Sequence, residues 1–91
     1  MDMRKLVGRN VRRIRLEKSL TQEQFADRSG FAQQYLSDLE RGRRNPTVVT
    51  LFELSQALGA TPIELITPDA EALILKPAVI KNGRSTSKQK R

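Results

Sequence analysis

The chain has 91 residues, a net charge of +7 and a pI near 10.6, and it contains neither cysteine nor histidine, which excludes disulfides, zinc sites built from those residues and thiolate or imidazole catalysis. No apolar run approaches the roughly 18 residues of a membrane-spanning helix, and the start lacks a secretory signal, so we expect a soluble, cytoplasmic protein with no membrane partner. One small core fits this length, and the charge favours a polyanionic partner such as nucleic acid, with no enzyme activity, metal or cofactor expected.

The first expected element is an amphipathic helix over residues 3–17. Val7, Val11 and Ile14 recur at helical spacing, which places them on one face. Three arginines lie mostly on the other side: Arg9, Arg12 and Arg13. This basic face is either a solvated surface or a contact for phosphates, and the sequence favours neither.

Two short helices joined by a tight turn are expected next, over residues 22–28 and 33–41. Thr21 and Gln24 form a capping box before the first of them, because each side chain can bind the backbone N–H at the position of the other. Gly30 then ends that helix, since glycine enters the left-handed region at little steric cost. The pattern is typical of a helix-turn-helix.

The contact between these two helices is predicted from small and apolar side chains. Ala26 lies in the middle of the first helix, where its methyl group allows the second helix to approach. Leu36 and Leu39 are three residues apart, so they share one face and can pack on Phe25 and Ala26. The opposite face of the second helix is polar.

Two further helices are expected over residues 48–58 and 62–66. Thr47 caps the first of them, and its apolar residues recur with helical period: Val48, Leu51, Leu54 and Leu58. Gly59 ends it. The last helix begins with a second capping box that has proline at the first helical position: Thr61, Pro62 and Glu64. It should carry three apolar residues: Ile63, Leu65 and Ile66.

The remaining residues give weaker signals. Residues 67–76 contain an apolar run, LIL, and are expected to form a short helix or a dimerisation extension. Residues 77–91 are expected to be a basic, disordered tail. Residues 1–66 carry 11 basic and 8 acidic side chains, whereas residues 67–91 carry 6 basic and 2 acidic ones, so more than half of the net charge lies in the second segment.

A specific combination of motifs runs from Thr21 to Pro46: TQEQFA, a glycine four residues after its alanine, a leucine pair, and E-R-G-x-x-N-P. With RRIRLEKSL before it and LFELSQALGATPIELI after it, this segment resembles the phage repressor and Cro-like helix-turn-helix DNA-binding proteins, also called the XRE family. The resemblance covers roughly residues 4–66. It implies an all-α, five-helix, lambda-repressor-like domain over residues 1–66, encoded by a bacterium or phage and associated with the nucleoid.

One position departs from the family pattern. Ala32 stands where a serine or threonine usually caps the second helix of the motif, and losing such a cap costs about 0.5–2 kcal/mol. Phe31 can compensate in part by packing on Leu36.

By resemblance, the second helix of the motif enters the major groove of double-stranded DNA. Matched residue by residue, its base-facing positions are Gln33, Gln34, Ser37 and Asp38. Glutamine can bind adenine through N6 and N7, serine can contact several bases, and aspartate can accept from cytosine N4. Two alternatives stay open. Gln33 and Gln34 can be an ordinary polar surface, and Asp38 can pair with Arg41 instead of a base.

The resemblance also implies contacts that position the protein without reading sequence. Residues expected to bind phosphates are Gln22, Tyr35, Arg43, Arg44 and Asn45. The hydroxyl of Tyr35 either binds a phosphate or is exposed at the helix edge. Arg15 and Glu40 are expected to form a partly buried ion pair that braces the first helix against the recognition helix.

The function implied is a sequence-specific transcriptional regulator, a repressor acting as a homodimer on a pseudo-palindromic operator. Its expected dimer interface contains Ile63, Ile66, Leu73 and Leu75. The alternative for Ile63 and Ile66 is that they only complete the monomer core. A second function of another class is an antitoxin or similar interaction module of the same family, which binds a protein partner such as a toxin and autoregulates its operon.

Overall fold

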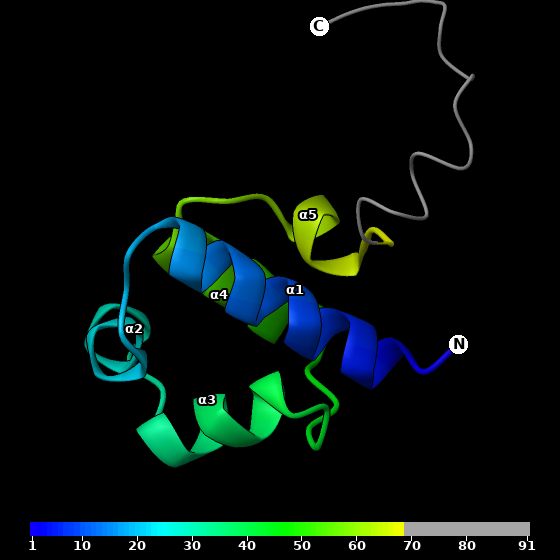
Figure 1. Ribbon diagram of the computed structural model, residues 1–91, viewed down its shortest axis with the longest axis horizontal. Coiled ribbons are helices and arrows are strands. Elements are labelled where there is room, and N and C mark those ends of the chain that lie inside the picture. The colour runs from blue at the N-terminus through cyan, green and yellow to red at the C-terminus, as the bar shows by residue number, and fades with distance from the viewer. Residues whose placement is uncertain (69–91) are drawn as a thin grey trace, which may run out of the picture.

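The computed structural model describes residues 1–68, which form five α-helices and no strand (Figure 1). In chain order, the helices are α1 (Met3–Glu17), α2 (Gln22–Ser29), α3 (Gln33–Glu40), α4 (Val48–Leu58) and α5 (Pro62–Ile66). The all-α prediction is confirmed. Every helix begins at the expected residue, while α2 ends one residue later and α3 one residue earlier than expected. The predictions for residues 69–91, including Leu73 and Leu75, lie outside the described residues.

Side-chain caps explain where four of these helices begin. Asp2 accepts hydrogen bonds from the N–H groups of Arg4 and Lys5 at the start of α1. Both capping boxes are present, at α2 and at α5, and Thr47 caps α4. α3 differs, because Ala32 provides no side-chain cap. No side-chain hydrogen bond therefore marks the start of α3, where the backbone N–H of Leu36 donates to the carbonyl of Ala32 at 3.1 Å.

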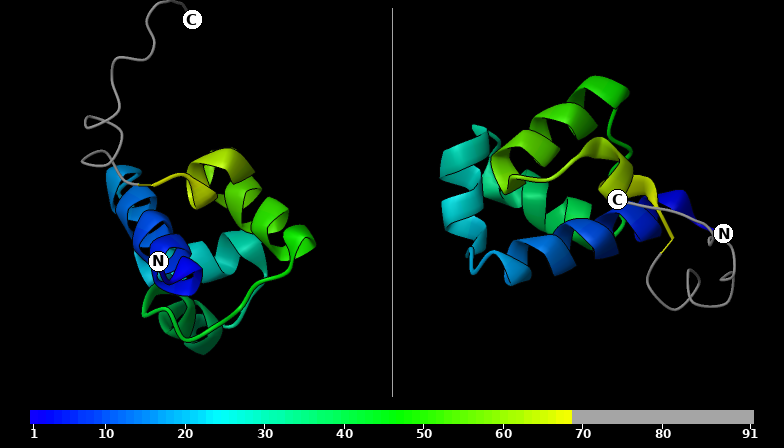
Figure 2. Two further views of the ribbon diagram at one scale, coloured as in Figure 1. Left: turned by 90° about the vertical axis from the view of Figure 1, so that its right-hand side faces the viewer. Right: turned by 90° about the horizontal axis from the view of Figure 1, so that it is seen from above.

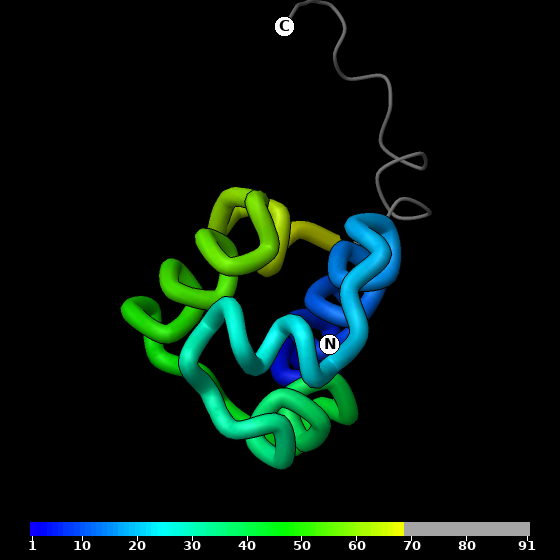
Figure 3. The backbone as a smooth tube through the Cα atoms, turned by 90° about the vertical axis from the view of Figure 1, so that its left-hand side faces the viewer, coloured from blue at the N-terminus to red at the C-terminus, as the bar shows by residue number. Residues whose placement is uncertain are grey.

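The helices surround one apolar core. Figures 2 and 3 show the arrangement of the helices from three further sides. α1 packs against α3 and α5, α2 packs against α3 and α4, and α4 packs against α5. The largest buried side chains in this core include Phe25 of α2, Leu36 and Leu39 of α3, and Leu54 of α4. α3 lies on the lower side of the molecule in Figure 1, with one face toward this core.

The core is narrower than the helical periodicity indicates. Val48 is 81% exposed, although it shares a helical period with the buried Leu54 and Leu58. In α5, Leu65 is 0% exposed, so the neighbouring Ile63 and Ile66 point outward and are 69% and 42% exposed. The alternative in which these two isoleucines only complete the monomer core is therefore wrong.

A buried polar side chain joins the first and last helices. Asn10 of α1 is 0% exposed, and its side-chain amide donates to the carbonyl of Leu65 at 3.0 Å and to that of Thr67 at 2.8 Å. These bonds satisfy carbonyls at the end of α5 that the short helix leaves without intrahelical partners. Among residues 1–68, no helix is long and apolar enough to cross a membrane.

Candidate nucleic-acid interface

α3 is amphipathic, with apolar side chains on one face and polar side chains on the opposite face. Leu36 and Leu39 are 0% exposed and belong to the core. The residues expected to face bases lie elsewhere on the helix, the first two exposed and the last two half-buried: Gln33, Gln34, Ser37 and Asp38. Because the leucines fix the rotation of α3 about its axis, its first turn presents both glutamines to the outside.

The chain after α3 folds back over the last turn of the helix in a Schellman motif. The N–H of Gly42 donates to the carbonyl of Leu39 at 3.0 Å, and the N–H of Arg43 donates to the carbonyl of Asp38 at 2.9 Å. Gly42 has a φ of 78°, in the left-handed region that favours glycine. The motif thus holds the basic loop of residues 41–45 beside α3.

Asp38 joins a glutamine of α3 to an arginine of this loop. Its Oδ1 accepts a hydrogen bond from Nε2 of Gln34 at 3.0 Å, and its Oδ2 lies 3.4 Å from a guanidinium nitrogen of Arg44. The alternative pairing with Arg41 is wrong. The loop turns back toward the helix, so Arg44 is the arginine that reaches the carboxylate.

An aromatic pair supports the same arginine. The rings of Phe31 and Tyr35 are stacked with centroids 5.3 Å apart, and the guanidinium of Arg44 lies over the Tyr35 ring at 5.3 Å from its centroid. A cation is attracted to an aromatic face at this distance. Tyr35 therefore acts as a platform for Arg44. Phe31 stacks on Tyr35 and also packs against the core cluster that contains Leu36, where a contact was expected.

The expected ion pair between α1 and α3 is present and buried. Nε of Arg15 donates to Oε2 of Glu40 at 2.6 Å, and a terminal nitrogen of the guanidinium donates to Oε1 at 3.1 Å. The two side chains are only 8% and 4% exposed. Arg15 also donates to the carbonyl of Leu20 at 2.7 Å. The pair thus braces α1 against the end of α3.

Gln22 adds α2 to this arrangement. Its side-chain Nε2 donates to Oε1 of Glu40 at 3.1 Å, so one carboxylate binds groups from α1 and from the first turn of α2. The sequence did not predict this bond. The expected phosphate contact at Gln22 involves backbone N–H groups at the start of α2, so this side-chain bond does not compete with it, and the contact stays a prediction.

A glycine brings the backbones of α1 and α3 together at the same point. A Cβ atom added to Gly8 would lie 2.9 Å from the carbonyl oxygen of Glu40, closer than real side chains come. Gly8 is buried in the middle of α1. The C-terminal end of α3 is therefore in direct backbone contact with α1, next to the ion pair of Arg15 and Glu40.

Comparison with known proteins identifies the family to which this arrangement of helices belongs. The model of a helix-turn-helix family matches residues 11–66, which is more than half of the chain. The chain belongs to this helix-turn-helix family. The resemblance to the XRE-type repressors is confirmed, and membership of the helix-turn-helix family makes the protein a DNA-binding transcriptional regulator.

Three helix-turn-helix relatives are covered by this chain over most of their own length. The HTH-type transcriptional regulator y4dJ of Sinorhizobium fredii is 69% identical over 71 residues, covering 78% of this chain and 92% of that protein. The crystal structure of the hypothetical transcription factor NHTF from Neisseria superposes with a TM-score of 0.74 at 32% identity, covering 81% of this chain and 85% of the other. The restriction-modification controller protein C.Esp1396I, in the crystal structure of its tetramer with its natural 35 base-pair operator, has a TM-score of 0.66 at 31% identity, covering 71% and 86%.

Proposed function

We propose that this helix-turn-helix regulator reads its operator with the first turn of α3 in the major groove. The observation that carries the proposal is the exposure of Gln33 and Gln34 on a helix whose rotation is fixed by the buried Leu36 and Leu39. Each glutamine can bind an adenine through two hydrogen bonds, which discriminates against other bases by roughly 1–3 kcal/mol. Ser37 lies one turn further along and is half-buried, so it reaches fewer groups.

The loop after α3 supplies the proposed phosphate contacts. Arg43, Arg44 and Asn45 are exposed, and the Schellman motif holds them beside the reading helix. Charged and amide side chains in this position bind backbone oxygens and set the register without reading sequence. At the other end of the motif, the backbone N–H groups at Gln22 and the hydroxyl of Tyr35 are proposed to bind phosphates as well.

A homodimer is the proposed binding unit. One copy of α3 contacts few base pairs, whereas a two-fold dimer doubles the contacts and places half-sites about 34 Å apart. C.Esp1396I binds its operator as a tetramer, which supports an oligomer here. The outward Ile63 and Ile66 supply an apolar surface for a second copy. We propose that the dimer represses transcription of a bacterial or phage operon in the cytoplasm.

The test is selection of bound sequences from a random DNA pool. We expect the wild-type protein to recover a pseudo-palindromic site with adenines at defined positions, and the symmetry reports the dimer. The variant with Gln33→Ala and Gln34→Ala should lose the preference at those positions. Gln56→Ala is the matched control, because Gln56 is an exposed helical glutamine on α4, and it should recover the wild-type site. If the double variant recovers the wild-type site, the proposed reading mode is wrong.

A further inference from the structure

One face of α1 lies against the C-terminal end of α3. Lys5, Gly8, Arg12 and Arg15 follow one another at intervals of three, four and three residues, which places them on a single helical face. Gly8 contacts the last carbonyls of α3, and Arg15 binds Glu40. We name these four residues the α3-facing stripe of α1. Gly8 and Arg15 are buried and make the helix contact, whereas the cations Lys5 and Arg12 are exposed and alternate with them along α1.

Lys5 lies next to the basic loop that follows α3. A Cβ atom on Gly42 would be 2.7 Å from Cγ of Lys5, so the lysine stem passes directly over the loop. Lys5 is exposed, and its ammonium makes no hydrogen bond or ion pair with residues 1–68. The charge of Lys5 therefore extends the cationic surface of Arg41 and Arg43 onto α1.

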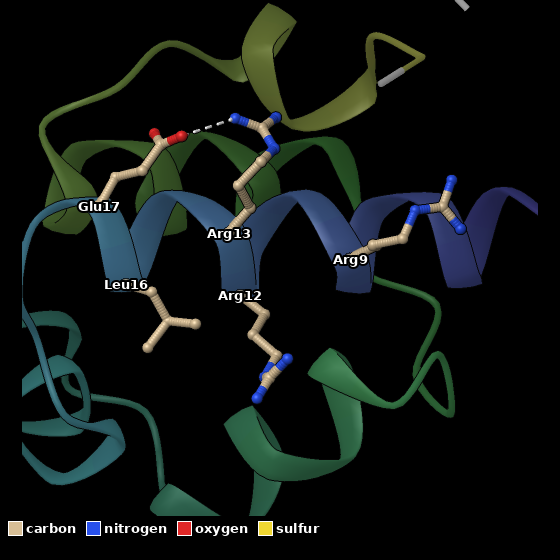
Figure 4. Close-up of a pocket in the computed structure, with 5 residues that line it drawn as sticks. All are labelled: Arg9, Arg12, Arg13, Leu16 and Glu17. Atoms are coloured by element: carbon tan, nitrogen blue, oxygen red, sulfur yellow. Dashed lines mark hydrogen bonds and ion pairs between the residues drawn. The ribbon is translucent and has the colours of Figure 1, made fainter. Parts of the chain in front are cut away.

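Arg12 and Arg13 are neighbours in sequence but differ in direction and in partners. Figure 4 shows Arg12 extending toward α3, whereas Arg13 points toward α5. Arg13 binds Glu17 at 3.4 Å and Asn10 at 3.2 Å. Arg12 is exposed and has no hydrogen-bond or ion-pair partner within residues 1–68. Its charge is available to a ligand on the side of the recognition helix.

We propose that Lys5 and Arg12 bind DNA phosphates that flank the groove occupied by α3. This inference rests on the proposed function. The two cations lie on the face of α1 that adjoins the recognition helix, and Lys5 is continuous with the basic loop, so one polyanion can engage all of them. The contacts add affinity for any duplex and carry no sequence information, because the phosphates are the same at every base pair.

The salt dependence of DNA binding tests the proposal. Lys5→Ala and Arg12→Ala should each reduce the slope of log Kobs against log salt concentration by about 0.9. The ratio of the wild-type binding constant to that of each variant should then fall about 3.5-fold when the salt concentration rises from roughly 50 to roughly 200 mM. Both variants should keep the wild-type base preference. Arg13→Ala is the matched control and should leave the slope unchanged, because Arg13 is paired and points away.

Thermal unfolding separates this role from a structural one. Cations near the last carbonyls of α3 also stabilise the helix dipole. If Lys5→Ala and Arg12→Ala lower the melting temperature while the salt slope stays at the wild-type value, the phosphate role is refuted. Arg12→Gln, which keeps most of the side-chain stem, should reduce the slope as Arg12→Ala does.

Replacing single DNA phosphates by neutral groups locates the phosphate that Arg12 is proposed to bind. With methylphosphonate at one backbone position of the duplex at a time, we expect a flanking position that weakens wild-type binding but not binding by Arg12→Ala. Equal weakening of both proteins at every position would overturn the proposal. Failure of the proposed reading mode is distinguishable, since it would appear as an unchanged base preference in the Gln33 and Gln34 variant, while the salt slope can be measured on any duplex.

Discussion

At its C-terminal end, α3 is fixed by a backbone contact with Gly8, a buried ion pair between Arg15 and Glu40, and the Schellman motif at Gly42. At its N-terminal end, Ala32 provides no side-chain cap, and both glutamines are exposed. The same eight-residue helix therefore has one end held by three contacts, two with α1 and one with the loop that follows it, and another end that faces outward.

This difference separates positioning from reading. The contacts at the C-terminal end of α3 fix the position of the helix relative to α1. They do not involve the side chains of the residues that are proposed to read bases. The first turn carries the side chains proposed to read sequence, and few contacts depend on it. Substitutions at Gln33 and Gln34 should therefore change specificity without unfolding the domain, whereas substitutions at the other end should do the reverse.

The largest effect is expected at Glu40. Glu40→Ala leaves the guanidinium of Arg15 buried with only a carbonyl partner, and removing one member of a buried pair lowers the free energy of unfolding by about 3–5 kcal/mol. Urea unfolding followed by circular dichroism measures this loss.

A second arginine–glutamate pair in α1 gives the control. Arg13 and Glu17 lie 3.4 Å apart, but their side chains are 46% and 58% exposed. Glu17→Ala should lower the free energy of unfolding by less than about 1 kcal/mol, because exposed pairs are screened by solvent. If Glu40→Ala and Glu17→Ala lower the free energy of unfolding equally, the buried pair contributes no more to stability than the exposed one. The proposed anchoring of α3 by Arg15 and Glu40 would then be wrong.

Local signals in the sequence predicted the helices well. The capping boxes at Thr21 and Thr61 involve residues three apart, and each glycine that ends a helix directly follows the last helical residue. These signals are local in sequence, so they can be recognised without knowing the fold. The ion pair of Arg15 and Glu40 came from the family resemblance. Spacing alone does not reveal it.

Long-range interactions were not predictable in the same way. Gln22 binds Glu40 across 18 residues, and Asn10 binds the end of α5 across 55, and no periodicity relates such positions. The helical period grouped Val48 with the core leucines, but it does not say where the core ends. Gly8 did carry a signal, since a glycine inside a helical pattern often marks a close packing contact.

A smaller effect is expected at the start of α3. Ala32 already has φ and ψ of −66° and 143°, close to the −75° and 169° of the capping residue Thr47. Ala32→Thr should therefore supply the missing cap and raise the free energy of unfolding by roughly 0.5–2 kcal/mol. Ala32→Val has nearly the same shape without the hydroxyl and is the matched control. If the two variants melt at the same temperature, the start of α3 does not gain from a side-chain cap.

The smallest change in stability is expected at Asp38, where it decides between two roles. Asp38→Ala removes a half-exposed ion pair with Arg44 and a hydrogen bond with Gln34, so stability should fall by less than about 1 kcal/mol. If Asp38 positions Gln34, its removal should relax preference at the base that Gln34 reads, and it should add nothing in a Gln34→Ala background. A direct contact would instead remove a preference for cytosine at a separate position, in either background. Sequence selection with the two single variants and the double variant distinguishes these outcomes, and because Asp38 holds both Gln34 and Arg44 in the free protein, we expect the first.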